Sequence, residues 1–160
     1  MAKITVNETA SFVSLDINAS GSFANANVAM ADTANVLTVP ALQDVTINAT
    51  PGTFTWEQLD SLSQQVVTTP STNSLDMNMV LDDTAFFTGA GSTLGLWDIT
   101  NNKTKAYFRL NMNGESAGDF YIEGEGYLSG LAMTVSPTAP VWVSPMSILV
   151  DGNYVQSAYA

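Results

Sequence analysis

Two glutamates are the residues best spaced for chemistry. Glu123 and Glu125 lie two residues apart in residues 119–125, which alternate as a strand does. Residues at i and i+2 of a strand share a face, so the carboxylates are expected about 6.5–7 Å apart at the backbone. Such a pair is the raw material of a glycoside hydrolase. In a working pair, one carboxyl lies in a dry pocket that raises its pKa. Nearby in sequence, only Tyr121 and Tyr127 are placed to supply aromatic side chains for such a pocket. A solvated strand face is therefore the preferred interpretation.

Three aspartates are the candidates for a metal site. Asp82 and Asp83, together with Asp98, could supply oxygen ligands to Ca²⁺. Neither EF-hand spacing nor another known loop pattern is present. Asp82 and Asp83 also precede an apolar stretch with helical spacing, where a carboxylate accepts hydrogen bonds from the free amides of the first turn. We therefore expect these two residues to cap a helix, and we expect no metal and no cofactor.

The residue types that are absent restrict catalysis. The chain has no Cys and no His, which excludes disulfides, thiolate sites and the commonest general base. Its serines have only Lys3, Lys103 and Lys105 as lysine bases, so the usual triad cannot be assembled. Trp56, Trp97 and Trp142 could stack on sugars, but such residues are more often core or interface anchors. The sequence predicts that the protein is not an enzyme.

The charge balance restricts the partners. The chain has 160 residues, 15 acidic and 4 basic, with a formal net charge of −11. Such a surface repels phosphate, which disfavours ordinary nucleic-acid binding and docking on anionic membranes. The first eight residues lack the apolar stretch of a signal peptide, and no segment approaches the roughly 20 apolar residues of a membrane span. We expect a chain made in the cytoplasm, with no membrane partner.

The centre of the chain predicts a strand, a short helix and a second strand. In both strands apolar residues alternate with polar ones, and between them apolar residues recur at three- and four-residue steps. The residues expected to face the core are Leu75, Met77, Met79 and Leu81 in the first strand, Phe87, Ala90, Leu94 and Trp97 in the helix, and Phe108, Leu110 and Met112 in the second strand.

The rest of the chain reads mainly as strands and loops. Further strands are expected at residues 12–17, 36–39, 44–49, 64–69, 119–125, 127–135 and 141–150, with Leu131, Met133 and Val135 buried. Turns or loops are expected at 18–27, 50–53, 68–73 and 111–118. Residues 24–34 fit a helix or a strand, residues 56–63 fit a helical turn or a connector, and Gly124 and Gly126 suggest a bend where a side chain would crowd a crossing backbone.

These elements predict a single domain over residues 1–160. The fold class is mostly β: an antiparallel β-sandwich or β-barrel with one short flanking α-helix. The structure of residues 1–35 is left open, and residues 153–160 are expected to form a loose C-terminal tail.

The order of several motifs resembles the major tail tube proteins of long-tailed bacteriophages. Residues 57–63 read Glu-Gln-Leu-Asp-Ser-Leu-Ser and precede a polar loop and the strand Ser-Leu-Asp-Met-Asn-Met from residue 74. Residues 104–110 read Thr-Lys-Ala-Tyr-Phe-Arg-Leu, residues 120–131 read Phe-Tyr-Ile-Glu-Gly-Glu-Gly-Tyr-Leu-Ser-Gly-Leu, and residues 148–152 read Ile-Leu-Val-Asp-Gly. The resemblance covers residues 36–152. The long strand before Gly126, Pro145 in the last strand and residues 1–35 depart from the family.

The resemblance implies a structural protein of the virion. Members of that family form hexameric rings that stack into a hollow tube, and DNA passes through the lumen without specific binding. It also implies assembly in the host cytoplasm, and tail initiator and terminator proteins as partners. An acidic lumen would let DNA slide, because a wall that attracts phosphate would hold it.

The resemblance also gives candidate residues for each surface. Lumen-lining candidates are Asp76, Asn78, Glu123 and Glu125, and ring-contact candidates are Asn18, Asn25, Asn27, Thr69, Pro70 and Asn73. Three alternatives stay open. They are a tube subunit of a contractile injection or secretion system, a glycan-binding β-sandwich module that uses Trp56 or Trp142, and a glycosidase that uses Glu123 and Glu125.

Overall fold

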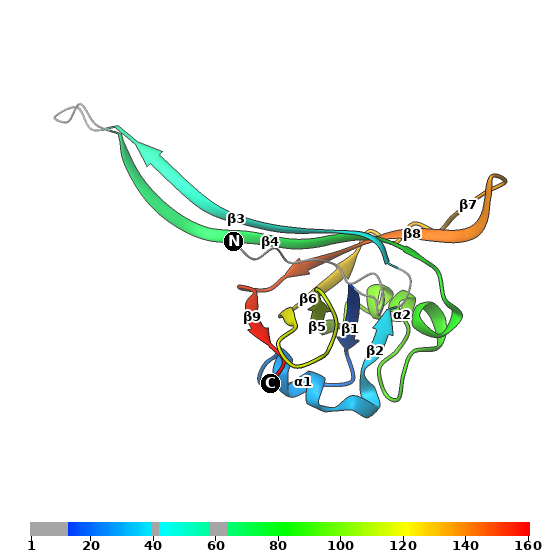
Figure 1. Ribbon diagram of the computed structural model, residues 1–160. Coiled ribbons are helices and arrows are strands. Elements are labelled where there is room, and N and C mark those ends of the chain that lie inside the picture. The colour runs from blue at the N-terminus through cyan, green and yellow to red at the C-terminus, as the bar shows by residue number, and fades with distance from the viewer. Residues whose placement is uncertain (1–12, 40–41, 58–63) are drawn as a thin grey trace.

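A single antiparallel sheet forms most of the structure (Figure 1). The computed structural model describes residues 13–39, 42–57 and 64–160, and nine strands lie within them. The strands are β1 (Ser14–Asn18), β2 (Leu37–Val39), β3 (Leu42–Trp56), β4 (Gln65–Val80), β5 (Lys105–Asn111), β6 (Phe120–Ser129), β7 (Thr134–Ser136), β8 (Ala139–Val150) and β9 (Val155–Ala158). Their order is β2-β1-β5-β6-β8-β4-β3, with β7 paired to β8 and β9 paired to β6.

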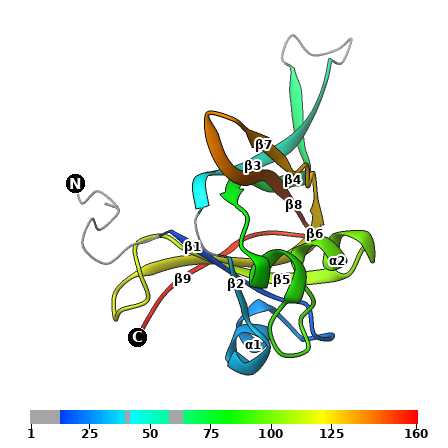
Figure 2. The same ribbon diagram turned by 90° about the vertical axis from the view of Figure 1, so that its right-hand side faces the viewer.

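The sheet bends so that its two halves share one core (Figure 2). Leu15 of β1 and Phe108 of β5 pack in the same cluster as Leu75 of β4 and Ile148 of β8. The mostly β, antiparallel prediction is confirmed. In place of a sandwich or a closed barrel, the described residues form one bent, open sheet.

The first central strand behaves as its alternation predicts, since Leu75, Met77 and Met79 are buried. In β5 the predicted residues Phe108 and Leu110 are buried, but so are Tyr107 and Asn111 on the opposite face, because α1 and the C-terminal residues cover that face.

Of the two aspartates expected to cap a helix, only Asp82 does so: its Oδ1 accepts a hydrogen bond of 3.1 Å from the amide of Ala85. Asp83 stands at the N-cap position but makes no side-chain cap hydrogen bond.

The helical stripe between these strands was predicted wrongly. A π-helix, η2 (Thr84–Thr88), and the helix α2 (Leu96–Asn101) stand in place of one helix. Gly89 and Gly91 separate them with φ of 83° and 57°, values that favour glycine. The change of direction exposes Phe87, Leu94 and Trp97, and the core residues are Ala85, Phe86, Leu96 and Ile99 instead.

The turn at 50–53 and the loop at 68–73 were also predicted wrongly. Both stretches lie inside β3 and β4, which form one long hairpin. The register shifts between Thr50 and Gly52, opposite residues 69–72 of β4. Pro51, Gly52 and Pro70 therefore mark a β-bulge and not a chain reversal, while threonine and valine around them favour strand. Of the ambiguous residues 56–63, Trp56 ends β3, and 58–63 lie outside the described residues.

The two ends of the described chain are more ordered than expected. A helix, α1 (Ala26–Ala31), and a 3₁₀ turn, η1 (Thr33–Asn35), form where the sequence left helix and strand open. The loose tail predicted for residues 153–160 is instead β9, which pairs with residues 120–123 of β6. Tyr159 continues this contact, since its amide donates to the Asp119 carbonyl at 2.9 Å.

Two smaller predictions concern the strands after β5. The burial predicted for Met133 and Val135 is wrong, and Leu131 is only partly buried. The predicted strand is interrupted: β6 ends at Ser129, residues 130–133 form a connector, and Val135 lies in the exposed strand β7. Gly126 does lie where the backbone is crowded: an added Cβ would stand 2.2 Å from the Leu149 carbonyl oxygen. Pro145 is accommodated within β8, between the part that pairs with β7 and the part that pairs with β6.

Candidate assembly surfaces

A long hairpin arm projects beyond the body of the sheet (Figure 1). We define the arm as residues 52–56 of β3 and 65–69 of β4, which pair with each other from Gly52–Thr69 to Trp56–Gln65. The pairing of β4 with β8 reaches only to Asn73, so the arm extends about 25 Å past it at 3.3 Å per residue. These ten residues include no charged side chain.

The arm exposes large apolar side chains. Phe54 is 59% exposed, and Val66 and Val67 are exposed as well. Phe54 stacks on Trp56 with ring centroids 5.9 Å apart. Cross-strand partners share a face, so Phe54, Trp56 and Val67 form one apolar face of the arm. A hairpin of two strands is marginally stable alone, so this surface is suited to a partner.

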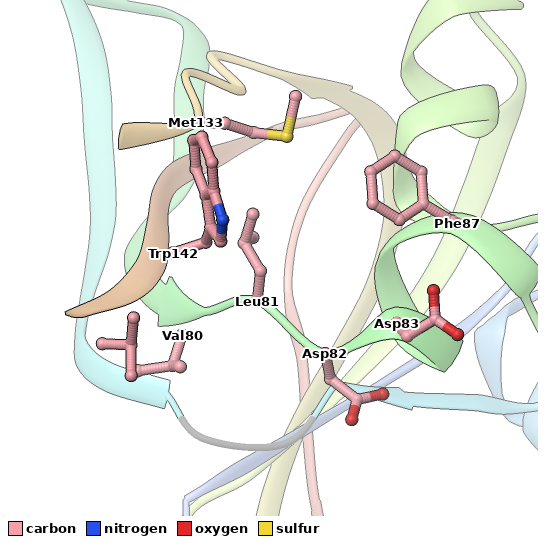
Figure 3. A pocket seen from close by; sticks show the side chains of 8 residues that line it. Val80, Leu81, Asp82, Asp83, Phe87, Met133 and Trp142 are labelled. Carbon is pink, nitrogen blue, oxygen red and sulfur yellow. The ribbon is translucent and has the colours of Figure 1, made fainter. Parts of the chain in front are cut away.

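An apolar groove lies at the opposite end of β4 (Figure 3). Its volume is about 550 Å³. The lining residues are Val80, Leu81, Asp82, Asp83, Phe87, Met133, Val141 and Trp142. The Leu81 amide donates to the Trp142 carbonyl at 2.9 Å, which joins the end of β4 to β8. Trp142 is 53% exposed, so its ring is available to a partner.

A polar face lies on the outer side of β3, β4 and β8. Asn78 Nδ2 donates to both carboxylate oxygens of Asp44, at 3.0 and 2.9 Å. Asn48 Nδ2 donates to Asp76 Oδ2 at 2.6 Å, and the Ser147 hydroxyl donates to Asp76 Oδ1. Asp44, Asp76, Asn78 and Ser147 surround one shallow depression. This face therefore carries carboxylates and amides, and the described residues that line the depression include no lysine or arginine.

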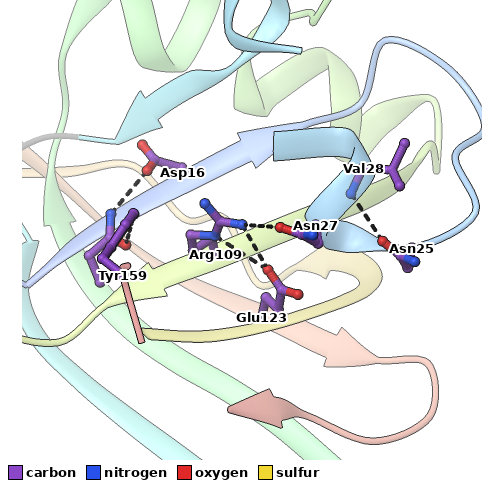
Figure 4. A network of polar contacts seen from close by, with 8 residues as sticks. Asp16, Asn25, Asn27, Val28, Arg109, Glu123 and Tyr159 are labelled. Atoms are coloured by element: carbon purple, nitrogen blue, oxygen red, sulfur yellow. Dashed lines mark hydrogen bonds and ion pairs between the residues drawn. The ribbon is translucent and has the colours of Figure 1, made fainter. Parts of the chain in front are cut away.

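The two glutamates lie in a different environment from Asp76 and Asn78. Glu123 is 6% exposed, and Arg109 Nη2 lies 3.0 Å from its carboxylate (Figure 4). Glu125 lies 2.8 Å from Lys105 Nζ, which also contacts Asp151 at 3.0 Å. The pocket beside the two glutamates includes Asn25, Asp151 and Asn153, so it is polar and not the dry site that a glycosidase acid requires.

Arg109 links several elements at this place. Its Nη2 donates to Asn27 Oδ1 at 3.0 Å, and its guanidinium lies 4.3 Å from the centre of the Tyr121 ring. Burial lowers the pKa of Arg109, but the interactions with Glu123 and, after it, with Tyr159 outweigh that effect, so the pKa lies above its ordinary value. Arg109 is therefore a permanent cation that neutralises a buried carboxylate.

The ring-contact candidates divide between buried and exposed positions. Asn18 is buried and donates to the Ala29 carbonyl at 2.8 Å, and Asn73 is buried and donates to the Gly152 carbonyl at 2.7 Å. Asn25 caps α1 by accepting from the Val28 amide at 3.0 Å. Thr69 and Pro70 are exposed on β4, at the base of the arm. The sequence had placed them in a loop, so the arm itself was missed; the Thr- and Val-rich stretches on both sides were the available signal.

The candidate metal site finds no support in the described residues, and Trp97, a candidate for sugar stacking, lies beside another aromatic ring. Among the described residues there is no group of His, Cys, Asp or Glu suited to hold a metal ion. Trp97 packs near Phe86, with ring centroids 6.0 Å apart. No helix in the described part of the chain has the length and apolar composition needed to cross a bilayer.

Two solved structures of gene transfer agent particles contain chains with a similar fold. The chain resembles a subunit of the tail of an empty gene transfer agent particle, determined by helical refinement with C6 symmetry, with a TM-score of 0.55 at 13% identity over 77% of this chain and 87% of that one. It also resembles a chain of the virion of a native gene transfer agent particle, with a TM-score of 0.53 at 13% identity over 77% and 89%. The chain shares its fold with these particle proteins. No protein-family model matches the sequence, and no curated protein matches it.

Proposed function

We propose that this protein is the structural subunit of a phage-type tail tube, localised to the virion. The observation that carries the proposal is the arm, an uncharged hairpin in which the exposed Phe54 stacks on Trp56. Among the described residues, the arm strands pair only with each other. Such an element gains its stability from another copy or another protein. The fold shared with the tail of a gene transfer agent particle supports a tube as the assembly.

The proposed assembly is a hexameric ring, and rings stack into a hollow tube. The six-fold symmetry of the similar tail supports this number of subunits. The proposal retains four exposed ring-contact residues: Thr69 and Pro70 at the base of the arm, Asn25 at the N-cap of α1 and Asn27 in its first turn. Initiator and terminator proteins at the two tube ends complete the proposed partners.

The polar face of β3, β4 and β8 is proposed to line the lumen. Asp76 and Asn78 lie on it, and among the described residues that line its depression there are carboxylates and an amide but no lysine or arginine. A wall of this kind repels phosphate and releases no counterions from DNA, so DNA passes without being held. The proposal omits Glu123, which is buried against Arg109. Glu125 is half-buried against Lys105 and is a secondary candidate.

The assembly is tested with the purified full chain. We expect rings or tubes with a central hole by negative-stain electron microscopy, and a mass that rises with concentration by light scattering on a sizing column. A strict monomer at every concentration and salt condition would contradict the proposal.

The lumen assignment needs a separate test. Asn78→Lys should leave tubes intact but make them retain linear DNA in a mobility-shift assay at low salt, because it places a ring of cations in the channel. Thr33→Lys, an exposed position on η1, is the matched control. Equal DNA retention by both variants would reject the polar face as the lumen.

A further inference from the structure

This chain exposes two apolar surfaces of complementary shape, a projecting ridge and a groove. One is the arm face of Phe54, Trp56 and Val67, which projects from one end of the sheet. The other is the groove that includes Phe87 and Trp142 at the opposite end. The first is a narrow ridge with an aromatic pair, and the second is a hollow of about 550 Å³. That volume lies in the range of pockets that enclose whole small ligands, so aromatic side chains fit within it.

The two surfaces cannot meet within one chain. The strand β4 begins in the arm at Gln65 and ends in the groove at Val80. Fifteen residue steps at 3.3 Å place these ends about 50 Å apart along the strand. Figure 1 shows the arm and the β7–β8 end on opposite sides of the molecule. The arm therefore cannot reach the groove of its own molecule, and an arm that enters a groove must come from another copy.

We propose that the arm face of one copy docks in the groove of a second copy. This inference rests on the proposed function and names the contact that builds the assembly. In the proposed assembly each copy places its arm in one neighbour and receives the arm of a different neighbour, so the contact is heterologous. Repetition of the contact then gives a ring or a stack.

The uncharged arm allows a second copy to be the occupant in spite of the acidic charge of the chain. Every copy carries a net charge of −11, so contacts between copies must keep carboxylates apart. The arm strands carry none, and the Asp82 carboxylate at the groove is turned to the Ala85 amide. Glu57 directly follows the arm in sequence, and Asp83 lines the groove, so added salt should strengthen the contact by screening their charges.

Cysteine cross-linking tests the pairing, since the chain has no cysteine of its own. Thr55→Cys on the arm and Asp83→Cys at the groove leave the apolar residues of both surfaces in place. Subunits with one substitution each are mixed under assembly conditions and treated with a short bis-maleimide. We expect a covalent dimer whose linked peptides contain positions 55 and 83. Ser116→Cys, in the exposed β5–β6 loop, replaces Asp83→Cys as the control.

The outcomes separate this inference from the proposed function. If rings or tubes form but give no 55–83 cross-link, or give as much 55–116 as 55–83 cross-link, the docking is wrong while the proposed function is retained. Failure of the wild type to assemble would overturn the proposed function, and the docking with it. A sugar that raises the melting temperature of the wild type but not of Trp142→Ala would make the groove a glycan platform instead.

A charge substitution gives an independent measurement. Val141→Asp in the groove should raise the concentration needed for assembly by about tenfold or more, since it puts a carboxylate into an apolar contact. Val155→Asp, an equally exposed valine on β9, is the matched control and should leave that concentration nearly unchanged. Equal effects of the two substitutions would overturn the docking.

Discussion

The arm and the β1–β5–β6 part of the sheet are both antiparallel strands, yet they obtain their stability differently. In β1, β5 and β6, apolar residues such as Ile17 and Phe108 are fully buried, and the polar Glu123 finds Arg109 within the same chain. In the arm, Phe54 and Val66 are more than half exposed, and among the described residues the two arm strands pair only with each other. The difference supports the proposal that the rest of the sheet is stable by itself, whereas the arm is stabilised by another molecule.

Removal of the arm should separate folding from assembly. Replacing residues 51–71 by Asn-Gly, which favours a tight hairpin turn, keeps the body strands and deletes the exposed apolar face. We expect rings and tubes to disappear from electron micrographs, while the circular dichroism melting temperature of the monomer changes little. A variant that still assembles would show that the arm is dispensable.

Paired phenylalanine substitutions compare the two regions directly. Phe108→Ala opens a cavity in the shared core and should lower the free energy of unfolding by about 3–5 kcal/mol. Phe54→Ala should lower it by less than about 0.5 kcal/mol in the monomer, since the ring is already exposed. Urea titration below the assembly concentration measures both. Similar losses would mean that the arm folds against its own body.

Substitution of two glycines outside the arm tests how closely the strands of the rest of the sheet pack. Gly126→Ala forces a Cβ to within 2.2 Å of the Leu149 carbonyl oxygen, so β6 and β8 must separate locally. A loss of about 1–3 kcal/mol is expected in thermal or urea unfolding. Gly21→Ala is the control, because nothing lies within 4 Å of its added Cβ. Tolerance of alanine at both positions would contradict the close approach of the two strands.

A smaller, pH-dependent effect is expected where the arm joins the body. The Tyr154 hydroxyl donates to the Ser74 carbonyl at 2.6 Å, and burial, followed by the charge of Asp76, raises the pKa of this tyrosine. A pKa raised on folding stabilises the protein fully below the unfolded pKa of about 10, and the contribution is lost as the pH rises through the folded pKa.

Substitution of this hydroxyl provides the test. Tyr154→Phe should cost about 0.5–1.5 kcal/mol at neutral pH and should reduce the loss of stability above pH 10. Tyr127→Phe, at an exposed tyrosine, is the control. An unchanged alkaline profile in Tyr154→Phe would rule out this linkage.

Some features that depend on local sequence patterns were predicted correctly. Alternation identified the buried face of Leu75, Met77 and Met79, and the paired aspartates identified the cap at Asp82. The arm was not predicted, because Pro51, Gly52 and Pro70 are typical of turns and only the pairing of β3 with β4 makes them a bulge.

The candidate site was predicted only in part, for a related reason. Asp76 and Asn78 lie on an open polar face, as strand alternation implies, whereas Glu123 has the same local pattern and is buried. Its burial depends on α1 and Arg109, which the strand pairing brings together from distant parts of the sequence. The groove likewise combines the end of β4, η2 and β8, and no short motif encodes such a surface.

Amide hydrogen exchange of the full chain at low and high concentration tests the central claim most directly. The arm amides should exchange quickly in the monomer, because an isolated two-stranded hairpin is marginally stable. They should become protected on assembly, together with the groove residues around Trp142, while the core amides of β1 and β5 stay protected throughout. Arm amides that exchange equally fast in monomers and assemblies would contradict the account.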